Sequence, residues 1–288
     1  MSAPYVPPPG VEAEKVDAAR DEVMTGLHST WCPGCGHGTL TQLLADCIGE
    51  LGLRDRIVLS VGVGCGGSLP AQLDVHCVLT PHGRASDTAT GIARMLPDRI
   101  VVQYSGDGDA CGIGLAGLMH ACNRAENFLV FIYNNNVYGM TGGQMGPTTT
   151  KEVPTTTFQG GRDESVMGYP IDIVKTLAHF PGVAYAARCA LTSGPRYVEA
   201  RKVVRRAFEI HESGVRGMKV IDALGNCNVN WKGGGVTFTP ETANDFIEQT
   251  IMPYFEMGEL RLPPGLRPVR VNSRPGNRQV QSSGAPSQ

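Results

Sequence analysis

Hydrophobic residues along this chain recur with two spacings, one typical of helices and the other of buried strands. Between residues 40 and 51 the apolar side chains fall three or four positions apart, and Gly52 follows them. This spacing predicts an amphipathic helix that ends at the glycine. The short apolar run at 57–61 leads instead into a glycine-rich segment, which indicates a buried strand that opens into a loop.

The same alternation continues along the chain. Residues 100–104 predict a strand, 106–109 its loop, 113–125 a helix and 128–133 the next strand, which together make a βαβ unit. Further helices are expected at 171–180, 196–212 and 241–257, and further strands at 183–189 and 218–223. Alternation of this kind predicts an α/β fold, with a mostly parallel sheet and helices on both faces.

The pattern also predicts how the chain is divided. Residues 134–168 are rich in Gly and Thr and follow neither period, and a loop of that length inside a compact domain is usually functional. From 261 onward the chain is dominated by Pro, Gly, Arg, Ser and Gln. We therefore expect one domain at 25–258, an N-terminal extension at 1–24 and a flexible or partner-bound tail at 259–288.

Composition narrows the function. The 288 residues, 41% of them hydrophobic, are enough to bury a full core. A formal net charge of -2 without a basic stripe argues against nucleic acid as a partner. The apolar runs are far shorter than the roughly 20 residues of a membrane helix, and the proline-rich start lacks the features of a secretory signal. A cytoplasmic protein without a membrane segment is expected.

Nine cysteines then suggest thiols or metal ligands rather than disulfides. The pair Cys32-Pro33-Gly34-Cys35 is compatible with zinc, with a redox disulfide or with half of an iron–sulfur site. Cys65 and Cys227 both lie in loops whose free N–H groups can bond to cluster sulfurs. The chain has no second C-x-x-C, which disfavours a zinc ribbon. Cysteines on apolar patterns are expected to be buried, namely Cys47, Cys122 and Cys189, with Cys77 and Cys111 leaning the same way.

A second group of polar residues follows two successive strands of the βαβ unit. Gly106-Asp107-Gly108-Asp109 ends one strand just before a helix, where N–H groups favour a phosphate and a carboxylate can hold Mg²⁺. An ordinary turn would have the same sequence. Asn134-Asn135-Asn136 closes the next strand and brings amide oxygens to the same sheet edge. Two adjacent strand ends can then share one metal.

This pair of segments resembles the motif of thiamine-diphosphate enzymes, which runs from Gly-Asp-Gly to an Asn pair. The resemblance implies that Asp107 and the side chain of Asn135 bind Mg²⁺, with the backbone carbonyl of Val137 as third ligand.

A wider resemblance covers residues 31 to about 150. The matching segments are WCPGCGHGTL, GVGCGG, His82-Gly83-Arg84-Ala85, GDGDACGIG and NNNVYGMTGGQ. In this order they look like the beta subunit of 2-oxoacid:ferredoxin oxidoreductases. The resemblance implies one [4Fe–4S] cluster on Cys32, Cys35, Cys65 and Cys227. It also implies thiamine-diphosphate contacts from Val63, Gly64, Cys65, Gly66, Gly108, Asp109, Gly139 and Met140.

Two histidines have less certain roles. The resemblance implies that His82 is a catalytic residue near the diphosphate, although Gly83 after it would also suit a turn histidine. His37 follows the first cysteine pair and could bond to the cluster, move protons or cap the helix that begins near Thr39. We keep His37 out of the catalytic set.

The family resemblance implies CoA-dependent oxidative decarboxylation of a 2-oxoacid, with electrons passed through the cluster to ferredoxin, or reductive carboxylation in reverse. It implies an alpha subunit that carries the pyrimidine-binding half, in a dimer of alpha–beta heterodimers. The stretch YGMTGGQMGPTT favours 2-oxoglutarate over pyruvate or branched-chain 2-oxoacids, while Ser68 stands where many relatives carry Lys or Arg. The alternatives are a non-redox thiamine-diphosphate decarboxylase, and a non-catalytic iron–sulfur or nucleotide-binding scaffold module.

Overall fold

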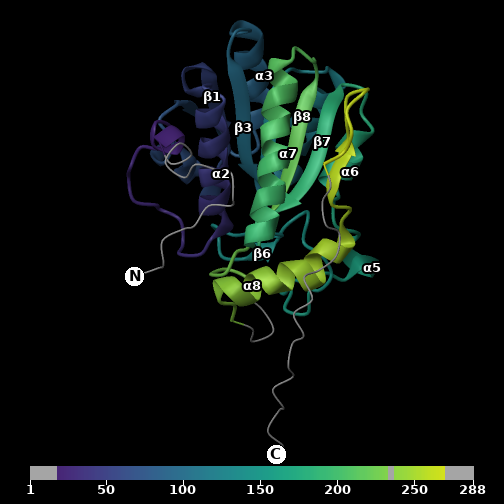
Figure 1. Ribbon diagram of the computed structural model, residues 1–288. Helices are drawn as coiled ribbons and strands as arrows, with labels where there is room; N and C mark the ends of the chain where they lie inside the picture. Colours follow the sequence, from purple (N-terminus) through teal and green to yellow (C-terminus); the bar gives the residue numbers. More distant parts are fainter. Residues whose placement is uncertain (1–17, 233–236, 270–288) are drawn as a thin grey trace, which may run out of the picture.

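The computed structural model describes residues 18–232 and 237–269, and its centre is a twisted sheet (Figure 1). Seven strands of these residues lie in the order β2-β1-β3-β4-β8-β7-β9. They are β2 (His76–Leu79), β1 (Ile57–Val61), β3 (Ile100–Gly106), β4 (Leu129–Asn134), β8 (Met218–Leu224), β7 (Val183–Ala190) and β9 (Gly258–Arg261). The first six are parallel and β9 is antiparallel to β7. The carboxyl ends of β1, β3, β4 and β8 therefore meet at one edge.

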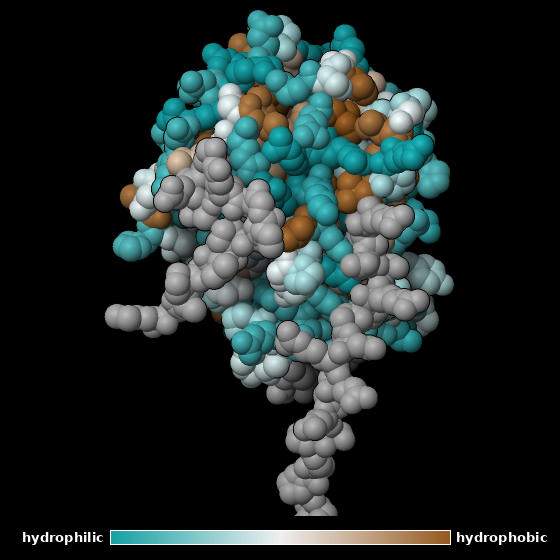
Figure 2. All heavy atoms as spheres, viewed as in Figure 1, coloured by the Kyte–Doolittle hydropathy of each residue, from teal (hydrophilic) through white to brown (hydrophobic). Residues whose placement is uncertain are grey.

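Helices cover both faces of the sheet, so the predicted α/β class is confirmed. On one face α2 (Gly36–Glu50) packs beside α7 (Gly194–Glu212), and their apolar sides form one core cluster with the strands. On the other face the second core cluster contains residues of α3 (Ala85–Met95), α4 (Leu115–Asn123) and α6 (Ile173–Ala178). Figure 2 shows mainly hydrophilic residues on the solvent side of the α2 and α7 face, with scattered hydrophobic ones. None of the helices among the described residues is long and apolar enough to cross a membrane.

Smaller elements gather beyond the carboxyl edge of the sheet. Figure 1 shows α8 (Pro240–Phe246) crossing below the sheet, close to β6 and α5. The helix continues through a π-helical turn, Ile247–Ile251, and a short 3-10 turn, Met252–Tyr254. The remaining elements there are the hairpin of β5 (Val137–Tyr138) and β6 (Gln144–Met145), and α5 (Glu164–Met167). A third hydrophobic cluster joins β5, α8 and the two turns after α8 to the ends of β7 and β8.

The expected strands all form within one or two residues of their predicted bounds, because each is almost entirely buried and most of its residues are apolar. The pattern misses β2 and α3. The residues of β2 are mostly exposed at the sheet edge, and the buried residues of α3 are the small Ala85, Ser86 and Ala89, so neither element shows a run of large apolar side chains. The segment 106–113 also differs, because Asp109–Ile113 forms a π-helical turn before α4 instead of a loop.

Packed residues of the fold lie just beyond both expected domain boundaries. The boundary at 258/259 divides β9, whose Glu259 carboxylate is buried against Tyr185 Oη (2.8 Å) and Arg206 Nη1 (3.0 Å). The boundary at 24/25 leaves out Val23, which is fully buried in the first core cluster. A short edge strand and a single buried valine show no hydrophobic period, and the residues around them are polar. The sequence pattern therefore gave no sign that they are packed. The remainder of the expected extension and tail, 1–17 and 270–288, lies outside the described residues.

Glu259→Gln tests whether β9 belongs to the folded domain. The substitution removes the buried ion pair with Arg206 and weakens the bond from Tyr185. Hydrogen bonds to charged groups contribute about 1.5–3 kcal/mol each, so the free energy of unfolding should fall by about that amount in urea titrations. The exposed pair of Glu209 with Arg205 offers the control, and Glu209→Gln should cost less than about 0.5 kcal/mol. Equal stability of both variants would mean that β9 contributes little.

Candidate cofactor site

A cavity of about 260 Å³ opens at the carboxyl edge of the sheet, beyond the ends of β1, β3 and β4. It is the place where α/β sheets usually bind ligands. The cavity is lined by predicted cofactor contacts, namely Val63, Gly64, Cys65, His82, Gly108, Asp109, Gly139 and Met140. Gly66 is the exception, since it is buried against the ring of Tyr104. A larger hollow of about 710 Å³ lies over residues 151–167 and contains none of the predicted site residues.

The three predicted Mg²⁺ ligands also line this cavity. Asp107 directly follows β3 and is almost completely buried, and it accepts a hydrogen bond from the Thr148 hydroxyl. Burial raises the pKa of Asp107 to about 7. Asn135 Oδ1 accepts a bond from the backbone N–H of Val137 at 3.1 Å. A buried carboxyl group beside an amide oxygen and backbone carbonyls is the hard oxygen environment that Mg²⁺ prefers, and the cation would offset the cost of the buried charge.

A tight asparagine turn presents Asn135 to the cavity. Asn136 has a φ of +60°, in the left-handed region that Asn tolerates better than most residues. Asn134 Oδ1 accepts bonds from the backbone N–H and from Nδ2 of Asn136, at 3.1 and 2.8 Å. The carbonyl of Asn136 in turn accepts a bond from the Thr149 hydroxyl. The first and third asparagines thus build the turn, which leaves the second to face the cavity.

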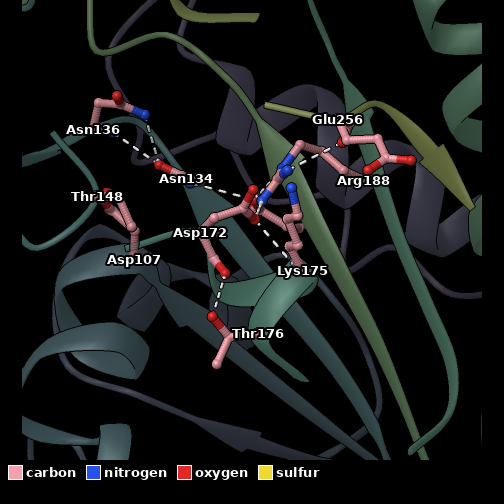
Figure 3. A network of polar contacts seen from close by, with 10 residues as sticks. Asp107, Asn134, Asn136, Thr148, Asp172, Lys175, Thr176, Arg188 and Glu256 are labelled. Carbon is pink, nitrogen blue, oxygen red and sulfur yellow. Dashed lines mark hydrogen bonds and ion pairs between the residues drawn. The ribbon is translucent and has the colours of Figure 1, made fainter. Parts of the chain in front are cut away.

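A buried ionic network contacts this turn through Asn134 (Figure 3). Asn134 Nδ2 lies 3.4 Å from Asp222 Oδ2, and Arg188 Nε donates to the same oxygen at 2.7 Å. Arg188 also bonds Asp172 Oδ1 at 2.6 Å and the carbonyl of Glu256 at 3.1 Å. The side chains of Arg188 and Asp222 are fully buried in β7 and β8. The sequence signal for them is a charged residue inside a mostly apolar strand.

His82 and Asp109 form a second polar group at the cavity. Asp109 Oδ1 lies 2.7 Å from His82 Nδ1 and accepts the Gly83 N–H at 2.7 Å. With Nδ1 occupied, Nε2 is the ring nitrogen that remains for a ligand. Among the described residues Asp109 Oδ2 is a buried oxygen without a partner, and a Cβ at Gly62 would approach it to 2.0 Å. The glycine loop after β1 is therefore packed directly against this carboxylate.

The segments that carry the four predicted cluster ligands are joined by hydrogen bonds beside the cavity, since Trp31 Nε1 donates to the carbonyl of Cys65 and the loop of Cys227 bonds to Pro33 and Gly34. Burial, together with the nearby Cys35, Cys65 and Cys32, raises the pKa of the Cys227 thiol to about 12. Cys65 lines the cavity as well, so it belongs to both groups. Across 18–232 and 237–269 no three His, Cys, Asp or Glu side chains converge on one point as for a single ion. A four-iron cluster takes one thiolate on each of several irons, so its ligands surround a larger centre.

The other cysteines behave as predicted from their patterns. Cys47, Cys122 and Cys189 are buried in the core clusters, and so is Cys111. Cys77 on the edge strand β2 is half-buried against the first cluster.

His37 lines the cavity and follows Cys35 by two residues. Its imidazole is buried between the rings of Trp31 and Tyr133, with centroid distances of 5.6 and 3.8 Å. Nδ1 is 2.7 Å from Tyr104 Oη, and burial lowers the pKa of His37 to about 3. Helix α2 begins at Gly36 with Cys35 as its N-cap residue, so the alternative that His37 caps the helix is wrong.

The fold and this cavity define a thiamine-diphosphate-binding domain, and a family comparison agrees. Residues 64–222, more than half of the chain, match the family "Thiamine pyrophosphate enzyme, C-terminal TPP binding domain". Comparison with individual relatives narrows the family further. The 2-oxoglutarate synthase subunit KorB of Archaeoglobus fulgidus is 36% identical over 217 residues, or 75% of each chain. The beta subunit of a 2-oxoacid:ferredoxin oxidoreductase from Sulfolobus sp is 31% identical over 261 residues, covering 82% of this chain and 80% of that one. The chain belongs to the family of 2-oxoacid:ferredoxin oxidoreductase beta subunits.

Two further comparisons bear on length and fold. The ketoisovalerate oxidoreductase subunit VorA of Methanothermobacter thermautotrophicus is 40% identical over 200 residues, which are 69% of this chain but only 42% of VorA. The chain thus spans less than half of that relative. A solved 2-oxoglutarate:ferredoxin oxidoreductase from Magnetococcus marinus has the same fold, with a TM-score of 0.69, 23% identity and 86% of both chains covered.

Proposed function

We propose that this chain is the catalytic beta subunit of an enzyme that decarboxylates a 2-oxoacid oxidatively, forming acyl-CoA and CO₂ and passing electrons to ferredoxin. The observation that carries the proposal is the position of Cys65, which lines the diphosphate cavity and also lies with the three other loop cysteines. An electron carrier beside the cofactor serves one-electron oxidation and has no use in a simple decarboxylase. The same machinery run in reverse would carboxylate an acyl-CoA.

In this proposal the chain holds thiamine diphosphate through Mg²⁺ and through its glycine loops. Asp107, the side chain of Asn135 and the carbonyl of Val137 are the metal ligands. The fit rests on a buried carboxyl group of raised pKa and on the glycines of the cavity wall, Gly64, Gly108 and Gly139, which let the backbone approach a phosphate closely. When bound, the cofactor supplies a nucleophilic carbon that adds to the 2-oxo group and takes up the electrons left by CO₂.

The remaining site residues orient the reactants and carry charge. His82, held through Nδ1 by Asp109, presents Nε2 to the diphosphate or to the substrate and can hold a proton there. Cys32, Cys35, Cys65 and Cys227 bind one [4Fe–4S] cluster as thiolates. Loop N–H groups beside them, such as that of His37 toward Cys35, lower the cost of charge on sulfur.

The cavity also supports a partner subunit. Val63 and Met140 line it, yet 49% and 58% of their surfaces are exposed, and exposed apolar side chains around a binding site mark a surface that another protein covers. We propose that an alpha subunit with the pyrimidine-binding half lies on this face, in a dimer of alpha–beta heterodimers that works in the cytoplasm with ferredoxin and coenzyme A.

For the substrate we favour 2-oxoglutarate. The names of the KorB relative and of the Magnetococcus marinus enzyme support it, while VorA acts on ketoisovalerate by name, so branched-chain 2-oxoacids and pyruvate are the competing substrates. Ser68 lies on the loop that follows Cys65 and is half-buried, so it can contact the substrate only if that loop faces the reacting carbon.

Met140→Glu tests the proposed alpha-subunit surface. A carboxylate placed where an apolar side chain is covered must lose its water, so we expect at least a tenfold weaker complex with the alpha subunit. Co-purification and analytical ultracentrifugation measure the effect. The control is Met95→Glu at the far end of α3, where Met95 is 78% exposed, and this change should leave the complex intact. If both variants bind alike, the alpha subunit covers another face.

One experiment tests the function as a whole. The chain is co-expressed with its neighbouring subunit, purified anaerobically and assayed with a panel of 2-oxoacids, coenzyme A and ferredoxin. We expect a brown protein with about four irons per chain that reduces ferredoxin, fastest with 2-oxoglutarate. A colourless, iron-free complex that still releases CO₂ would favour the non-redox decarboxylase, and failure to bind Mg-thiamine diphosphate would favour the scaffold module.

A further inference from the structure

Three asparagines alternate along the loop that carries Cys227, and the first two reach the loop of the first cysteine pair. Asn226 Nδ2 donates to the carbonyl of Gly34 at 3.1 Å, and Asn228 Nδ2 donates to the carbonyl of Pro33 at 3.2 Å. Both acceptors lie between Cys32 and Cys35. The residues on either side of Cys227 therefore hold it against the segment that supplies two other thiols.

The same loop reaches the diphosphate cavity on its other side. Asn230 Nδ2 donates to the carbonyl of Gly139 at 2.7 Å, and Trp231 Nε1 donates to the carbonyl of Asn135 at 2.7 Å. A Cβ built on Gly139 would lie 3.1 Å from Cys227 Sγ. One short segment thus contacts both the loop with two thiols and the loop with the amide ligand of the metal site.

The amides of Asn226 and Asn228 each leave a buried oxygen unpaired, which lowers stability and so calls for another explanation. In the described part of the chain, Oδ1 of Asn226 and Oδ1 of Asn228 are buried without a hydrogen-bond partner. An unpaired buried carbonyl lowers the free energy of unfolding, and such groups are few in natural proteins. Only the donor ends of these amides are used. Both donate to the loop of the first cysteine pair, and Asn226 Nδ2 donates also to Asn244 Oδ1 of α8 at 2.7 Å. Precise placement of that loop against Cys227 is the role that fits.

We propose that Asn226, Asn228 and Asn230 form a clamp that positions Cys227 as the fourth cluster ligand and ties it to the diphosphate loop. The inference rests on the cluster of the proposed function. The three asparagines are positioning residues, because they act through Cys227 and the two loops and need not touch iron. By holding the loops of Cys32, Cys35 and Cys227 together before iron arrives, the clamp lowers the cost of ordering these thiols on binding.

Asn228→Ala is the most direct test, because Asn228 is half-buried and its loss should not unfold the domain. Loss of an outer partner of a metal ligand typically lowers metal affinity 10- to 100-fold. In the complex purified anaerobically we therefore expect iron release to a chelator to be about tenfold faster or more. The EPR spectrum of the reduced cluster should shift as well, because the geometry at Cys227 changes, whereas the thermal unfolding midpoint should barely move.

Matched variants separate positioning from general damage. Asn228→Gln keeps an amide donor and should restore slow iron release and the original EPR spectrum. Asn123→Ala removes an exposed asparagine at the end of α4 and should behave as the unmodified protein. Asn230→Ala should release iron faster and also weaken Mg-thiamine diphosphate binding, which is measurable by calorimetry without turnover, because its bond to Gly139 belongs to the cavity side.

The outcomes are distinct. If the unmodified complex holds iron and Asn228→Ala releases it at the same rate with the same spectrum, the clamp is rejected and the proposed function stands. If Asn228→Ala proves unstable, Asn228→Gln is the deciding variant, because it retains the amide donor. A stably folded Asn228→Gln variant with faster iron release and an altered EPR spectrum would also reject the clamp. If the unmodified complex contains no iron, both the cluster and the clamp are wrong.

Discussion

Asp107→Ala should abolish useful binding of Mg-thiamine diphosphate. Asp107 is the charged member of the proposed ligand set, and truncating one partner of a buried charge pair costs about 2–5 kcal/mol, or roughly thirtyfold to several thousandfold in affinity. Because burial already raises the pKa of this carboxyl to about 7, its removal should not destabilise the cofactor-free protein. Calorimetric titration with Mg²⁺ and thiamine diphosphate measures the loss, and thermal unfolding checks the fold.

Asp107→Asn is the matched control. Asparagine keeps the shape and can still accept the hydrogen bond from Thr148, but it lacks the negative charge. We expect an affinity between those of Asp107→Ala and the unmodified protein. If both variants bind the cofactor as tightly as before, the metal site lies elsewhere and the Gly-Asp-Gly segment is an ordinary turn.

Cys227→Ala should remove the cluster and with it the reduction of ferredoxin. A [4Fe–4S] cluster takes four thiolates, and the loop that carries Cys227 is bonded to the segment between Cys32 and Cys35. We expect iron to fall from about four per chain to near zero after anaerobic purification, with loss of the brown absorption. Mg-thiamine diphosphate should still bind, because the cavity lining leaves Cys227 out.

Cys189→Ala provides the comparison. Cys189 is buried in β7 within the first core cluster, so its loss should cost about 1 kcal/mol of stability and leave the iron content unchanged. Equal iron in the two variants, whether high or low, would contradict the assignment of Cys227 as the fourth ligand.

The strands show how far a sequence pattern reaches. The run at 57–61 and the run at 218–223 predicted β1 and β8 closely, because strands that are buried on both faces are mostly apolar. The exposed edge strand β2 and the polar edge strand β9 were missed, since neither meets that condition. Because β9 is polar, the expected domain boundary at 258/259 fell within it.

The site divides in the same way. Asp107 and Asn135 were predictable because each directly follows a buried strand, and parallel neighbours β3 and β4 end at one edge. Arg188 and Asp222 were not, because a charge inside a strand acquires a role only when its partner on the neighbouring strand is known. Their contact with Asn134 depends on the pairing of β7, β8 and β4.

The sequence by itself determined the fold class and the diphosphate motif, because these depend on short segments whose spacing is fixed by the backbone. The tertiary structure decided the rest. Cys227 is 162 residues beyond Cys65, and only the packing of the loop after β8 against Pro33 and Gly34 brings it to the others. Contacts between segments so distant depend on strand order and on the fit of side chains, neither of which has a period along the chain.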